Sequence, residues 1–524
     1  MLGAFVMSRD GHVINYYKIK PLTFVIFGAR GDLATRRIFP ALLDLACSER
    51  LPQTYTIVGI DQEELSNQTF QAQTQNFLAK HSGADSALIQ EFAAHVTYIS
   101  GSITSNRVYA RLKSLLLPDA NVIFYLACPP DLFDSAAKNI ATYGFAGKHC
   151  KYRGFHRLII EKPFGTNLAR ARKLNELLHS YYNEKDIYRI DHYLGKDAVQ
   201  NLMYFRFSNT VFEPLWNRHY IEKVEINVEE SDGIGNRGAY YDSVGASRDM
   251  LQNHLLQLLC LTAMEPPDAL APDHIRNNKI EVLKAVEIPR HSVLAPSCIR
   301  GQYIAPCRHE GTIQGQALSI TREVKLLSYN PDMPSHAYTK EHDVHPESYT
   351  ETFIAVKAYI KNMRWKDVPF LLKTGKALEK RCAEIVIHFK TCPIEVPGGK
   401  PGANKLILRI QPDEGIRLRF NTWNDEEYLL EQDELVSTMR NSSGTASDPY
   451  ERLLYNAIIG DSSLFIRFDE TEEAWRIMEP ILKIIQDDKH RNLEYYPAGS
   501  KGPDLTLLHK EAAASAHILD VCNQ

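Results

Sequence analysis

Two patterns of apolar and polar residues follow each other along the chain. Between about residues 21 and 165, short runs of apolar and β-branched residues alternate with segments of helical periodicity. The runs are residues 24–28, 55–60, 95–100, 121–127 and 157–163. Continuous apolar strands separated by helices are typical of a parallel sheet that is buried on both faces. We therefore predict a doubly wound α/β domain, with its ligand site at the carboxyl ends of the strands.

Beyond about residue 200, apolar and polar residues alternate within the strand-like segments. These segments are residues 223–230, 279–288, 383–390 and 405–412. Alternation predicts strands that bury one face only, as in an antiparallel sheet with helices on its other side. The expected organisation is an N-terminal extension (1–20), a nucleotide-binding domain (21–200) and a large α+β domain (201–524) with a mostly antiparallel sheet. Residues 304–346 mix proline, histidine and charged residues, which predicts an irregular insertion or long loop.

Composition and charge exclude several classes of protein. The chain has 524 residues, of which 44% are hydrophobic and 24% charged, as in a globular protein of two or more domains. The net charge of −4 gives no reason to expect nucleic acid or an anionic membrane as a partner. No stretch approaches the ~20 apolar residues of a membrane span, and the N-terminus does not resemble a secretory signal. Nine scattered cysteines without a C-x-x-C pair indicate reduced thiols in a cytoplasmic protein.

A glycine-containing turn follows the first buried strand. Gly28 and Gly31 would allow the backbone to approach a pyrophosphate, which the amino end of the next helix would also attract. The G-x-x-G-x-x-A pattern is weaker than G-x-G-x-x-G, and an ordinary strand-to-helix turn is the alternative. Because the turn opens a series of βαβ units, we expect it to bind a dinucleotide. The candidate residues are Gly28, Ala29, Arg30, Gly31, Asp32 and Leu33.

Two further clusters carry chemistry, the first of them at the end of a predicted strand. In "IIEKPFG" (159–165), a charged pair is placed where the sheet would meet its ligand, although a solvated lysine in a turn is the alternative. In "YRIDHYLGKDAVQN" (188–201), histidine, tyrosine and lysine supply N–H and O–H donors suited to a phosphate ester. A carboxylate is out of place in a phosphate site, so the nearby Asp191 is expected to bind a different partner. The alternative to a binding site is a polar helix start that Asp191 caps.

A third cluster lies on a predicted helix in "YYDSVGASRDMLQNHLLQLLCL" (240–261). From Arg248 on, this segment has a largely apolar second half, yet it carries Asp249 and His254. A histidine here can be an ordinary core residue. A buried imidazole that binds a carboxylate through its other nitrogen, however, has the tautomer and pKa range of a general base. Asp191 would supply that carboxylate if the two segments meet.

Taken together, these stretches resemble the glucose-6-phosphate dehydrogenase family. The resemblance covers nearly the whole chain from about residue 21. It rests on "GARGDLATRRIFPAL", "YLACPP", "EKPFG", "RIDHYLGKD", "RGAYYDSVGASRDMLQNHLLQ", "RGQY", "TETF", "RWKDVPFLLKTGKAL" and "EAWRI". It implies a Rossmann-type coenzyme domain and a large α+β domain, assembled as a homodimer or homotetramer. It also implies oxidation of β-D-glucose 6-phosphate to 6-phosphoglucono-δ-lactone, the entry step of the pentose phosphate pathway.

The resemblance implies a role for each candidate residue. His254 matches the general base that removes the C1 hydroxyl proton, and Asp191 matches the carboxylate that orients this histidine and stabilises its imidazolium. Lys162 matches the lysine that lies between substrate and coenzyme. The phosphate binders would be His192, Tyr193 and Lys196, the sugar contacts Glu230 and Asp249, and the further substrate-site residues Lys376 and Arg381. No metal is expected, because hydride transfer from an alcohol needs only a base and an oriented acceptor.

The chain departs from the family pattern where the coenzyme would bind. The family's second strand ends in V-G-x-A-R, whose arginine grips the 2′-phosphate of NADP, but here the position is Gln62, flanked by acids. An acidic residue at this strand end usually bonds the ribose hydroxyls of NAD. Against this, Arg30 stands in the glycine turn and is followed by Arg36 and Arg37, and its guanidinium can bind a 2′-phosphate bidentately. We expect NADP, with NAD as the alternative.

Two other functions stay open. A sugar oxidoreductase of the glucose–fructose oxidoreductase type also joins a Rossmann domain to an α+β domain and carries an E-K-P motif, but it does not require "DHYLGK" or "RDMLQNHLLQ". A non-catalytic relative that binds NADP would be expected to lack His254 or Asp191, and both are present. Smaller departures from the family are Asp197, where glutamate is usual, and the length of the region 304–346.

Overall fold

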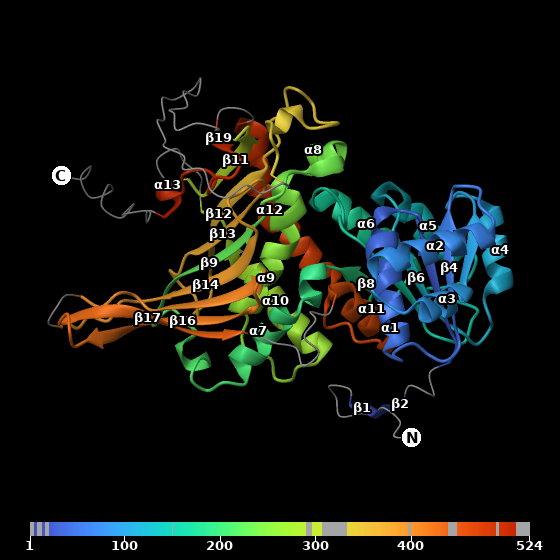
Figure 1. Ribbon diagram of the computed structural model, residues 1–524, viewed down its shortest axis with the longest axis horizontal. Helices are drawn as coiled ribbons and strands as arrows, with labels where there is room; N and C mark the ends of the chain where they lie inside the picture. The colour runs from blue at the N-terminus through green and yellow to red at the C-terminus, as the bar shows by residue number, and fades with distance from the viewer. Residues whose placement is uncertain are drawn as a thin grey trace. The chain divides into compact units, whose positions relative to one another are not determined.

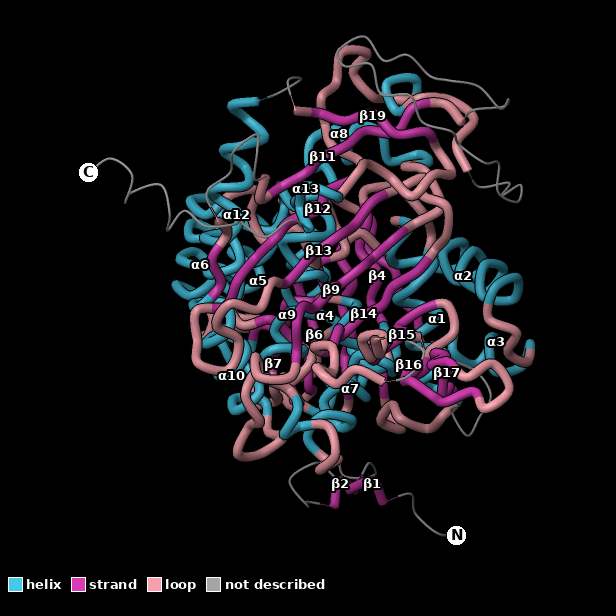
Figure 2. Tube along the Cα trace, turned by 90° about the vertical axis from the view of Figure 1, so that its left-hand side faces the viewer, coloured by secondary structure: helices cyan, strands magenta, loops and turns pink. Residues whose placement is uncertain are grey.

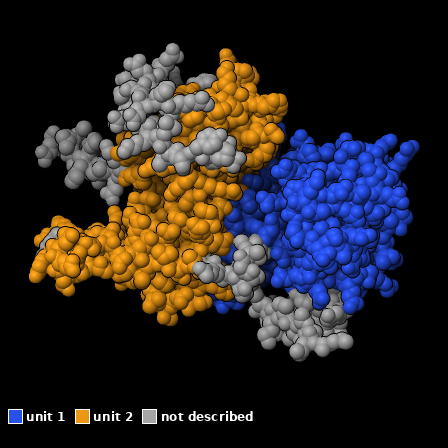
Figure 3. All heavy atoms as spheres, in the orientation of Figure 1, with its two compact units in different colours: residues 1–197, 266–278, 445–472 blue, residues 198–265, 279–444, 473–524 orange. Residues whose placement is uncertain are grey.

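The structure, a computed structural model, describes residues 20–148, 150–289, 296–306, 333–396, 400–438, 448–488 and 492–509, with the backbone of 5–7 and 13–15. These residues belong to two compact units, which Figure 3 colours separately. Unit 1 consists of residues 1–197, 266–278 and 445–472, and unit 2 of residues 198–265, 279–444 and 473–524. Two later segments therefore return to unit 1, and the domain boundaries after residues 20 and 200 stay a prediction.

Unit 1 is built around a seven-stranded sheet with the order β18-β8-β7-β6-β3-β4-β5. Its strands are β3 (Leu22–Phe27), β4 (Tyr55–Asp61), β5 (Val96–Ser100), β6 (Asn121–Leu126), β7 (His156–Ile160), β8 (Ile187–Ile190) and β18 (Phe465–Ile466). All neighbours pair in parallel except β8 and β18. From β5 to β8 this is the strand order of a dinucleotide-binding sheet. The predicted parallel sheet and its five expected strands are confirmed.

Helices alternate with these strands, as Figure 1 shows. They are η2 (Ala34–Ile38), α1 (Phe39–Cys47), α2 (Asn67–His81), α3 (Ser86–Ala94), α4 (Asn106–Leu115), η3 (Pro130–Leu132), α5 (Phe133–Thr142), α6 (Leu168–Tyr181), η4 (Glu184–Asp186), η5 (His192–Gly195) and α11 (Pro449–Ile459). The side chains of Ser66, Asp85 and Asn167 each accept a backbone N–H bond at the start of a helix. These caps satisfy donors that the first helical turn leaves without partners, and so define where the helices begin.

Unit 2 contains a ten-stranded sheet, whose main path is β17-β16-β15-β14-β9-β13-β12-β11-β19, with β10 paired to β12. Its strands lie side by side in Figure 2. They are β9 (Ile221–Glu229), β10 (Val286–Glu287), β11 (Cys298–Ile304), β12 (Phe353–Ile360), β13 (Phe370–Gly375), β14 (Cys382–Phe389), β15 (Lys405–Gln411), β16 (Gly415–Asn424), β17 (Leu429–Thr438) and β19 (Leu493–Pro497). Most neighbours are antiparallel, whereas β9 with β13 and β11 with β19 are parallel. The predicted α+β architecture is confirmed.

The helices of unit 2 include the one predicted from Arg248. It begins as a π-helix, η8 (Ser247–Leu255), and continues as α9 (Leu256–Ala263). The other helices are η6 (Glu213–Leu215), η7 (Gly235–Arg237), α8 (Gly238–Ala246), η9 (Tyr338–Lys340) and α13 (Thr506–His509), while α7 (Asp197–Phe207), α10 (Pro272–Ala285) and α12 (Phe468–Asp488) contain residues of both units. Alternate residues of β9, Val224, Ile226 and Val228, are fully buried, as a strand with one apolar face requires.

One predicted strand is wrong. Residues 279–288 form the end of α10 and only the two-residue strand β10. Within this window the residues alternate, but the buried residues Ile275, Lys279, Ile280 and Leu283 repeat with the spacing of a helix. The helix begins upstream at Pro272, a residue that the first helical turn tolerates. The window was too short to separate the two periods.

Several other expectations fall partly outside the described residues. Of the predicted N-terminal extension, β1 (Phe5–Met7) and β2 (Val13–Asn15) pair as an antiparallel hairpin. Of the predicted insertion, residues 307–332 are not described, and residues 333–346 are irregular apart from η9. The described cysteines are free thiols. Within the described ranges, no helix combines the length and the apolar character that crossing a membrane would require.

Candidate active site

The glycine turn of unit 1 has the strand–turn–helix form that the sequence predicts. It leaves β3 at Gly28, whose φ of +84° lies in the left-handed region that favours glycine. A Cβ at this position would lie 2.5 Å from the carbonyl oxygen of Ala127, which follows β6. The amides of Gly28 and Ala29 donate to the carbonyl of Ile60, at 2.9 and 3.2 Å. The turn is therefore held tightly between the ends of β4 and β6.

Arg30 is bound to the end of β4 through both its backbone and its side chain. Its amide donates to Oδ2 of Asp61 at 3.0 Å, while the amide of Gln62 donates to Oδ1 at 2.7 Å. The Arg30 guanidinium forms an ion pair with Glu63, and both side chains remain partly exposed, at 31% and 50%. The Glu63 carbonyl accepts a hydrogen bond from the Tyr98 hydroxyl at 2.7 Å. Arg30 and Gln62 thus lie at the same edge of the parallel sheet. The ion pair between Arg30 and Glu63 could not be predicted from the sequence.

The segment after β8 brings the predicted phosphate-binding residues together. Asp191 is buried and caps η5, because its Oδ1 accepts the amide of Tyr193 at 2.9 Å. The rings of His192 and Tyr193 meet edge to face at 5.1 Å, and the Lys196 ammonium lies 4.9 Å from the centre of the Tyr193 ring. Asp191 is therefore a cap, as the alternative interpretation proposed. Capping uses one of its two carboxyl oxygens and does not exclude a second role.

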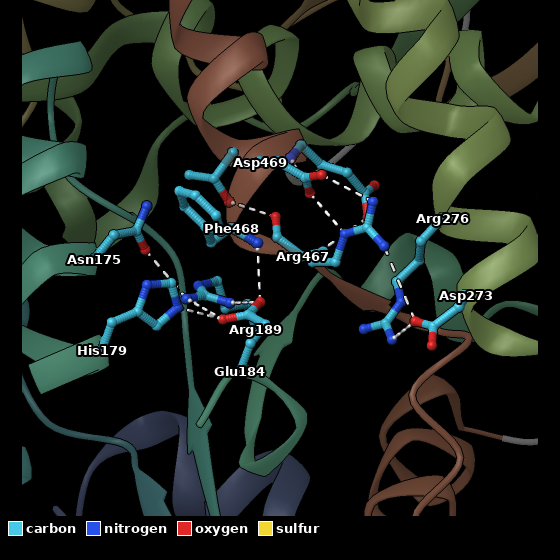
Figure 4. A network of polar contacts seen from close by, with 11 residues as sticks. Asn175, His179, Glu184, Arg189, Asp273, Arg276, Arg467, Phe468 and Asp469 are labelled. Carbon is cyan, nitrogen blue, oxygen red and sulfur yellow. Dashed lines mark hydrogen bonds and ion pairs between the residues drawn. The ribbon is translucent and has the colours of Figure 1, made fainter. Parts of the chain in front are cut away.

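A partly buried ion network fixes the strand from which Asp191 emerges (Figure 4). Arg189 is 1% exposed and donates to both carboxyl oxygens of Glu184, at 2.6 and 3.2 Å, and to Asn175 at 3.1 Å. Glu184 also contacts His179 Nε2 at 2.8 Å and accepts the amide of Phe468 at 3.0 Å. Burial raises the pKa of Glu184, but Arg189 and the other donors outweigh it and hold the pKa below its usual range. The network joins β8 to α6 and to the start of α12.

Glu161 and Lys162 follow β7, and two tyrosines complete their surroundings. The Tyr125 hydroxyl donates to Glu161 at 2.5 Å, and Tyr450 of α11 also hydrogen-bonds this carboxyl group. The Tyr450 ring lies nearly parallel to that of His192, with centroids 6.4 Å apart. Burial raises the pKa of Glu161 to about 7, against the opposing effects of Tyr125, Lys162 and Tyr450. Sequence reasoning missed Tyr450, since nothing in the sequence links residue 450 to the segment around His192.

In unit 2, strand register brings three predicted substrate residues to one edge of the sheet. Glu229 of β9 lies opposite Gly375 of the parallel strand β13 and opposite Cys382 of the antiparallel strand β14. Glu230 and Lys376 directly follow their strands and Arg381 directly precedes its strand, so all three lie at the same edge of the sheet. The Lys376 ammonium, only 4% exposed, forms an ion pair with Glu230. Arg381 is exposed. Burial raises the pKa of Glu230, but Lys376 outweighs it, so the pKa lies below its usual range.

The helix that packs against this edge carries Asp249 and His254. η8 contacts β9 and β13, and the two side chains are 6% and 0% exposed. Hydrogen bonds between residues five apart define a π-helix, so Asp249 and His254 lie one above the other along η8. The negative charge of Asp249 opposes the effect of Lys376 and raises the pKa of Glu230. The Lys376 ammonium also lies 5.4 Å from the centre of the Tyr241 ring. The π-helix was not foreseen, and such turns occur frequently at functional sites.

The predicted residues therefore form two sets, one in each unit. Unit 1 holds the glycine turn, Lys162 and the cluster from Asp191 to Lys196. Unit 2 holds Glu230, Asp249, His254, Lys376 and Arg381. The pairing of Asp191 with His254 joins residues of different units and stays a prediction.

Comparisons with known proteins cover nearly the whole chain. The family model for the NAD binding domain of glucose-6-phosphate dehydrogenase matches residues 25–201, and the model for the C-terminal domain of that enzyme matches residues 203–514. The chain is 37% identical over 500 residues to a glucose-6-phosphate 1-dehydrogenase of Gluconobacter oxydans (strain 621H), covering 94% of this chain and 96% of that protein. It is 39% identical over 505 residues to one of Treponema pallidum (strain Nichols), covering 93% and 92%.

Solved structures agree with these matches. A glucose-6-phosphate dehydrogenase in complex with its substrate glucose-6-phosphate superimposes with a TM-score of 0.80 at 32% identity, covering 93% of this chain and 96% of that one. A glucose-6-phosphate 1-dehydrogenase from Mycobacterium avium gives 0.77 at 33% identity, with the same coverage. The alternative of a glucose–fructose oxidoreductase type is not favoured.

The raised pKa of Glu161 predicts a pH-dependent stability. The folded pKa, about 7, lies above the ordinary value of 4.5, so the folded protein holds this proton more tightly than the unfolded chain. Stability from this proton is full at low pH and is lost as pH rises through about 7. As pH rises from 5 to 8, the free energy of unfolding of wild type should therefore fall by on the order of 1–3 kcal/mol relative to that of Glu161→Gln, which has no proton to lose at this position.

Urea denaturation at several pH values measures this difference. Glu176→Gln changes an exposed acid of the same unit in the same way and serves as the control. A difference between Glu161→Gln and wild type that stays constant with pH would contradict the raised pKa.

Proposed function

Since the chain belongs to the glucose-6-phosphate dehydrogenase family, we propose that it oxidises β-D-glucose 6-phosphate to 6-phosphoglucono-δ-lactone, with NADP⁺ as the hydride acceptor. This is the entry step of the pentose phosphate pathway. The observation that carries the proposal is the buried edge of the large sheet, where the Glu230–Lys376 pair lies beside the helix of Asp249 and His254. The edge offers charged groups for sugar hydroxyls and a buried imidazole for the proton.

The chemistry assigned to His254 is proton removal. It takes the proton of the C1 hydroxyl, and the electron pair of that O–H bond forms the lactone carbonyl. NADP⁺, when bound, supplies the acceptor for the hydride that leaves C1. Asp191 orients the imidazole and stabilises the imidazolium that forms. We assign the base to His254 because it is fully buried in an element that also carries a sugar-binding carboxylate.

The remaining residues bind and orient the substrate. His192 and Tyr193 on η5, with Lys196 directly after it, supply donors for the phosphate ester. The depressed pKa of Glu230 keeps it ionised at neutral pH, so it accepts hydrogen bonds from sugar hydroxyls together with Asp249. Lys376 and Arg381 would complete the substrate site, and Lys162 would contact both substrate and coenzyme, as the family resemblance implies.

The turn of unit 1 suits a nicotinamide dinucleotide. Gly28 leaves open backbone where a side chain would collide with Ala127, and residues 28–33 lead into the helix of η2 and α1. Both carboxyl oxygens of Asp61 already accept backbone amides, which makes this acid a poorer partner for the ribose hydroxyls of NAD. Arg30 supplies a guanidinium for the 2′-phosphate of NADP, with Gln62 beside it. NAD stays the second coenzyme.

The proposed assembly is a homodimer or homotetramer, and the proposed location is the cytoplasm. The location rests on the scattered cysteines and the assembly on the family resemblance. Sedimentation velocity of the purified protein would distinguish monomer, dimer and tetramer.

Removing the imidazole tests the assigned base. His254→Ala should lower kcat by roughly 10²–10⁴-fold and leave binding of glucose 6-phosphate close to that of wild type. His342→Ala makes the same change at a histidine that is 83% exposed and should leave kcat unchanged. Steady-state assays of coenzyme reduction at 340 nm, with calorimetry for binding, measure both. Wild-type turnover in His254→Ala would overturn the base, and turnover absent from the wild type itself would favour the non-catalytic relative.

The charge pair at the glycine turn predicts opposite effects of two variants. Arg30→Ala should lower the ratio of kcat/KM for NADP to that for NAD by roughly 10–100-fold, because a charge-assisted hydrogen bond to the 2′-phosphate is lost. Glu63→Gln should raise the ratio, because Arg30 no longer has Glu63 as a competing partner. Both ratios come from the same initial-rate assay. A ratio unchanged in both variants would show that Arg30 does not bind the 2′-phosphate.

A further inference from the structure

Two adjacent side chains, Glu351 and Thr352, connect the two elements of unit 2 that carry the proposed base and the sugar-binding lysine. They precede β12 and are 2% and 0% exposed. Neither is among the predicted site residues. From their contacts we propose that they are positioning residues, which fix the helix of His254 and the strand end of Lys376 relative to each other. The inference rests on the proposed function, which gives His254 and Lys376 their roles.

Glu351 holds the start of the helix that carries His254. Its Oε1 accepts the amide of Ser247 at 3.0 Å, and its backbone carbonyl accepts the amide of Ala246 at 2.9 Å. A carboxyl group at the amino end of a helix satisfies one of the amides that lack a partner within the helix. It also interacts favourably with the positive end of the helix dipole. Glu351 therefore fixes where η8 begins.

The turn before this helix is shaped around the same carboxyl group. Gly245 has a φ of +65°, and a Cβ there would lie 2.5 Å from Oε1 and 2.8 Å from Cδ of Glu351. The backbone thus approaches the carboxyl group as closely as the absence of a side chain allows. Because the approach leaves no space for adjustment, a change at Glu351 would shift the helix start and, with it, Asp249 and His254.

Thr352 holds the other element. Its carbonyl accepts the amide of Lys376 at 2.9 Å, and its hydroxyl accepts the amide of Tyr303 at 3.0 Å. The Tyr496 hydroxyl donates to the carbonyl of Lys376 at 2.7 Å, which leaves its oxygen to accept from the Thr352 hydroxyl at 2.8 Å. Both backbone groups of Lys376 are therefore held, directly or through Tyr496, by Thr352.

A merely structural role would predict a different outcome from a positioning role. In the proposed reaction, η8 and the end of β13 carry residues that contact the same sugar. The distance between these two elements must therefore suit the size of the sugar. A displacement of about 1 Å at a catalytic group can cost about 10²-fold in rate. Removing an ordinary core contact of unit 2, in contrast, would lower the stability of the protein and leave the rate of the folded enzyme unchanged.

Paired variants separate the two roles. Glu351→Met keeps the length of the side chain without an acceptor, and Glu351→Gln keeps an amide oxygen that can accept from Ser247. Thr352→Val removes the hydroxyl, and Thr352→Ser restores it. We expect Glu351→Met to lower kcat roughly 10- to 100-fold and Thr352→Val to raise the KM for glucose 6-phosphate roughly tenfold. Glu351→Gln and Thr352→Ser should recover most of each loss, and the Kd for NADP should stay unchanged throughout.

A paired acid elsewhere in unit 2, 21% exposed, provides the control. Glu213, on η6, forms ion pairs with Arg206 and Arg364 at 3.2 and 2.7 Å. Glu213→Met should lower Tm, measured by circular dichroism, without changing kcat or KM. If Glu351→Met and Thr352→Val behave like Glu213→Met, the positioning role is overturned. Should Glu351→Met not fold, the Thr352→Val and Thr352→Ser pair decides.

His254→Ala distinguishes failure of this inference from failure of the proposed function. Lost turnover in His254→Ala with normal kinetics in the Glu351 and Thr352 variants would overturn the positioning role alone. Retained turnover in His254→Ala would overturn the proposed base, and with it the premise of this inference.

Discussion

The register of β9 between β13 and β14 is the constraint on which the sheet edge of unit 2 depends. Glu229 lies opposite Gly375 in one neighbour and Cys382 in the other, so Glu230, Lys376 and Arg381 leave the sheet at the same point. The register is itself fixed by burial, because Val224, Ile226 and Val228 occupy the apolar face. A slip of one residue would replace all three by polar neighbours. The hydrophobic effect therefore determines which charged groups meet.

A second constraint of the same kind operates at the carboxyl edge of the parallel sheet. There the backbone of the glycine turn, not a side-chain pattern, sets the geometry, since its amides are bound by Ile60 and Asp61. Arg30 and Glu63 are then brought together by the parallel pairing of β3 and β4. The Arg30 guanidinium is thus paired with Glu63, which follows the next strand, and under the proposed function this acid would compete with the 2′-phosphate of NADP for Arg30.

The sequence was sufficient where a signal is local and insufficient where it depends on distant pairing. The five buried strands of unit 1 and the helix from Arg248 could be predicted because their periodicity is contained in each segment. Residues 279–288 could not, since a ten-residue window fits both periods. The predicted site residues came from motifs. Tyr450 lies in none of the quoted motifs, and Glu351 lies in "TETF" without any sign of its role, because what matters about both is contact with residues far along the chain.

Three acids in or beside the candidate site show how donors decide what a buried carboxyl group does. Glu161 receives hydrogen bonds from neutral tyrosines, which do not offset burial, and its pKa rises to about 7. Glu230 faces the Lys376 ammonium, which outweighs burial and keeps the group ionised. The Glu351 carboxyl group accepts the backbone amide of Ser247 at the start of a helix, where its fixed position is what matters. Burial of an acid near a reaction centre is therefore no evidence of acid–base chemistry by itself. The donors around each carboxyl group indicate whether it holds a proton, a charge or a neighbouring element in place.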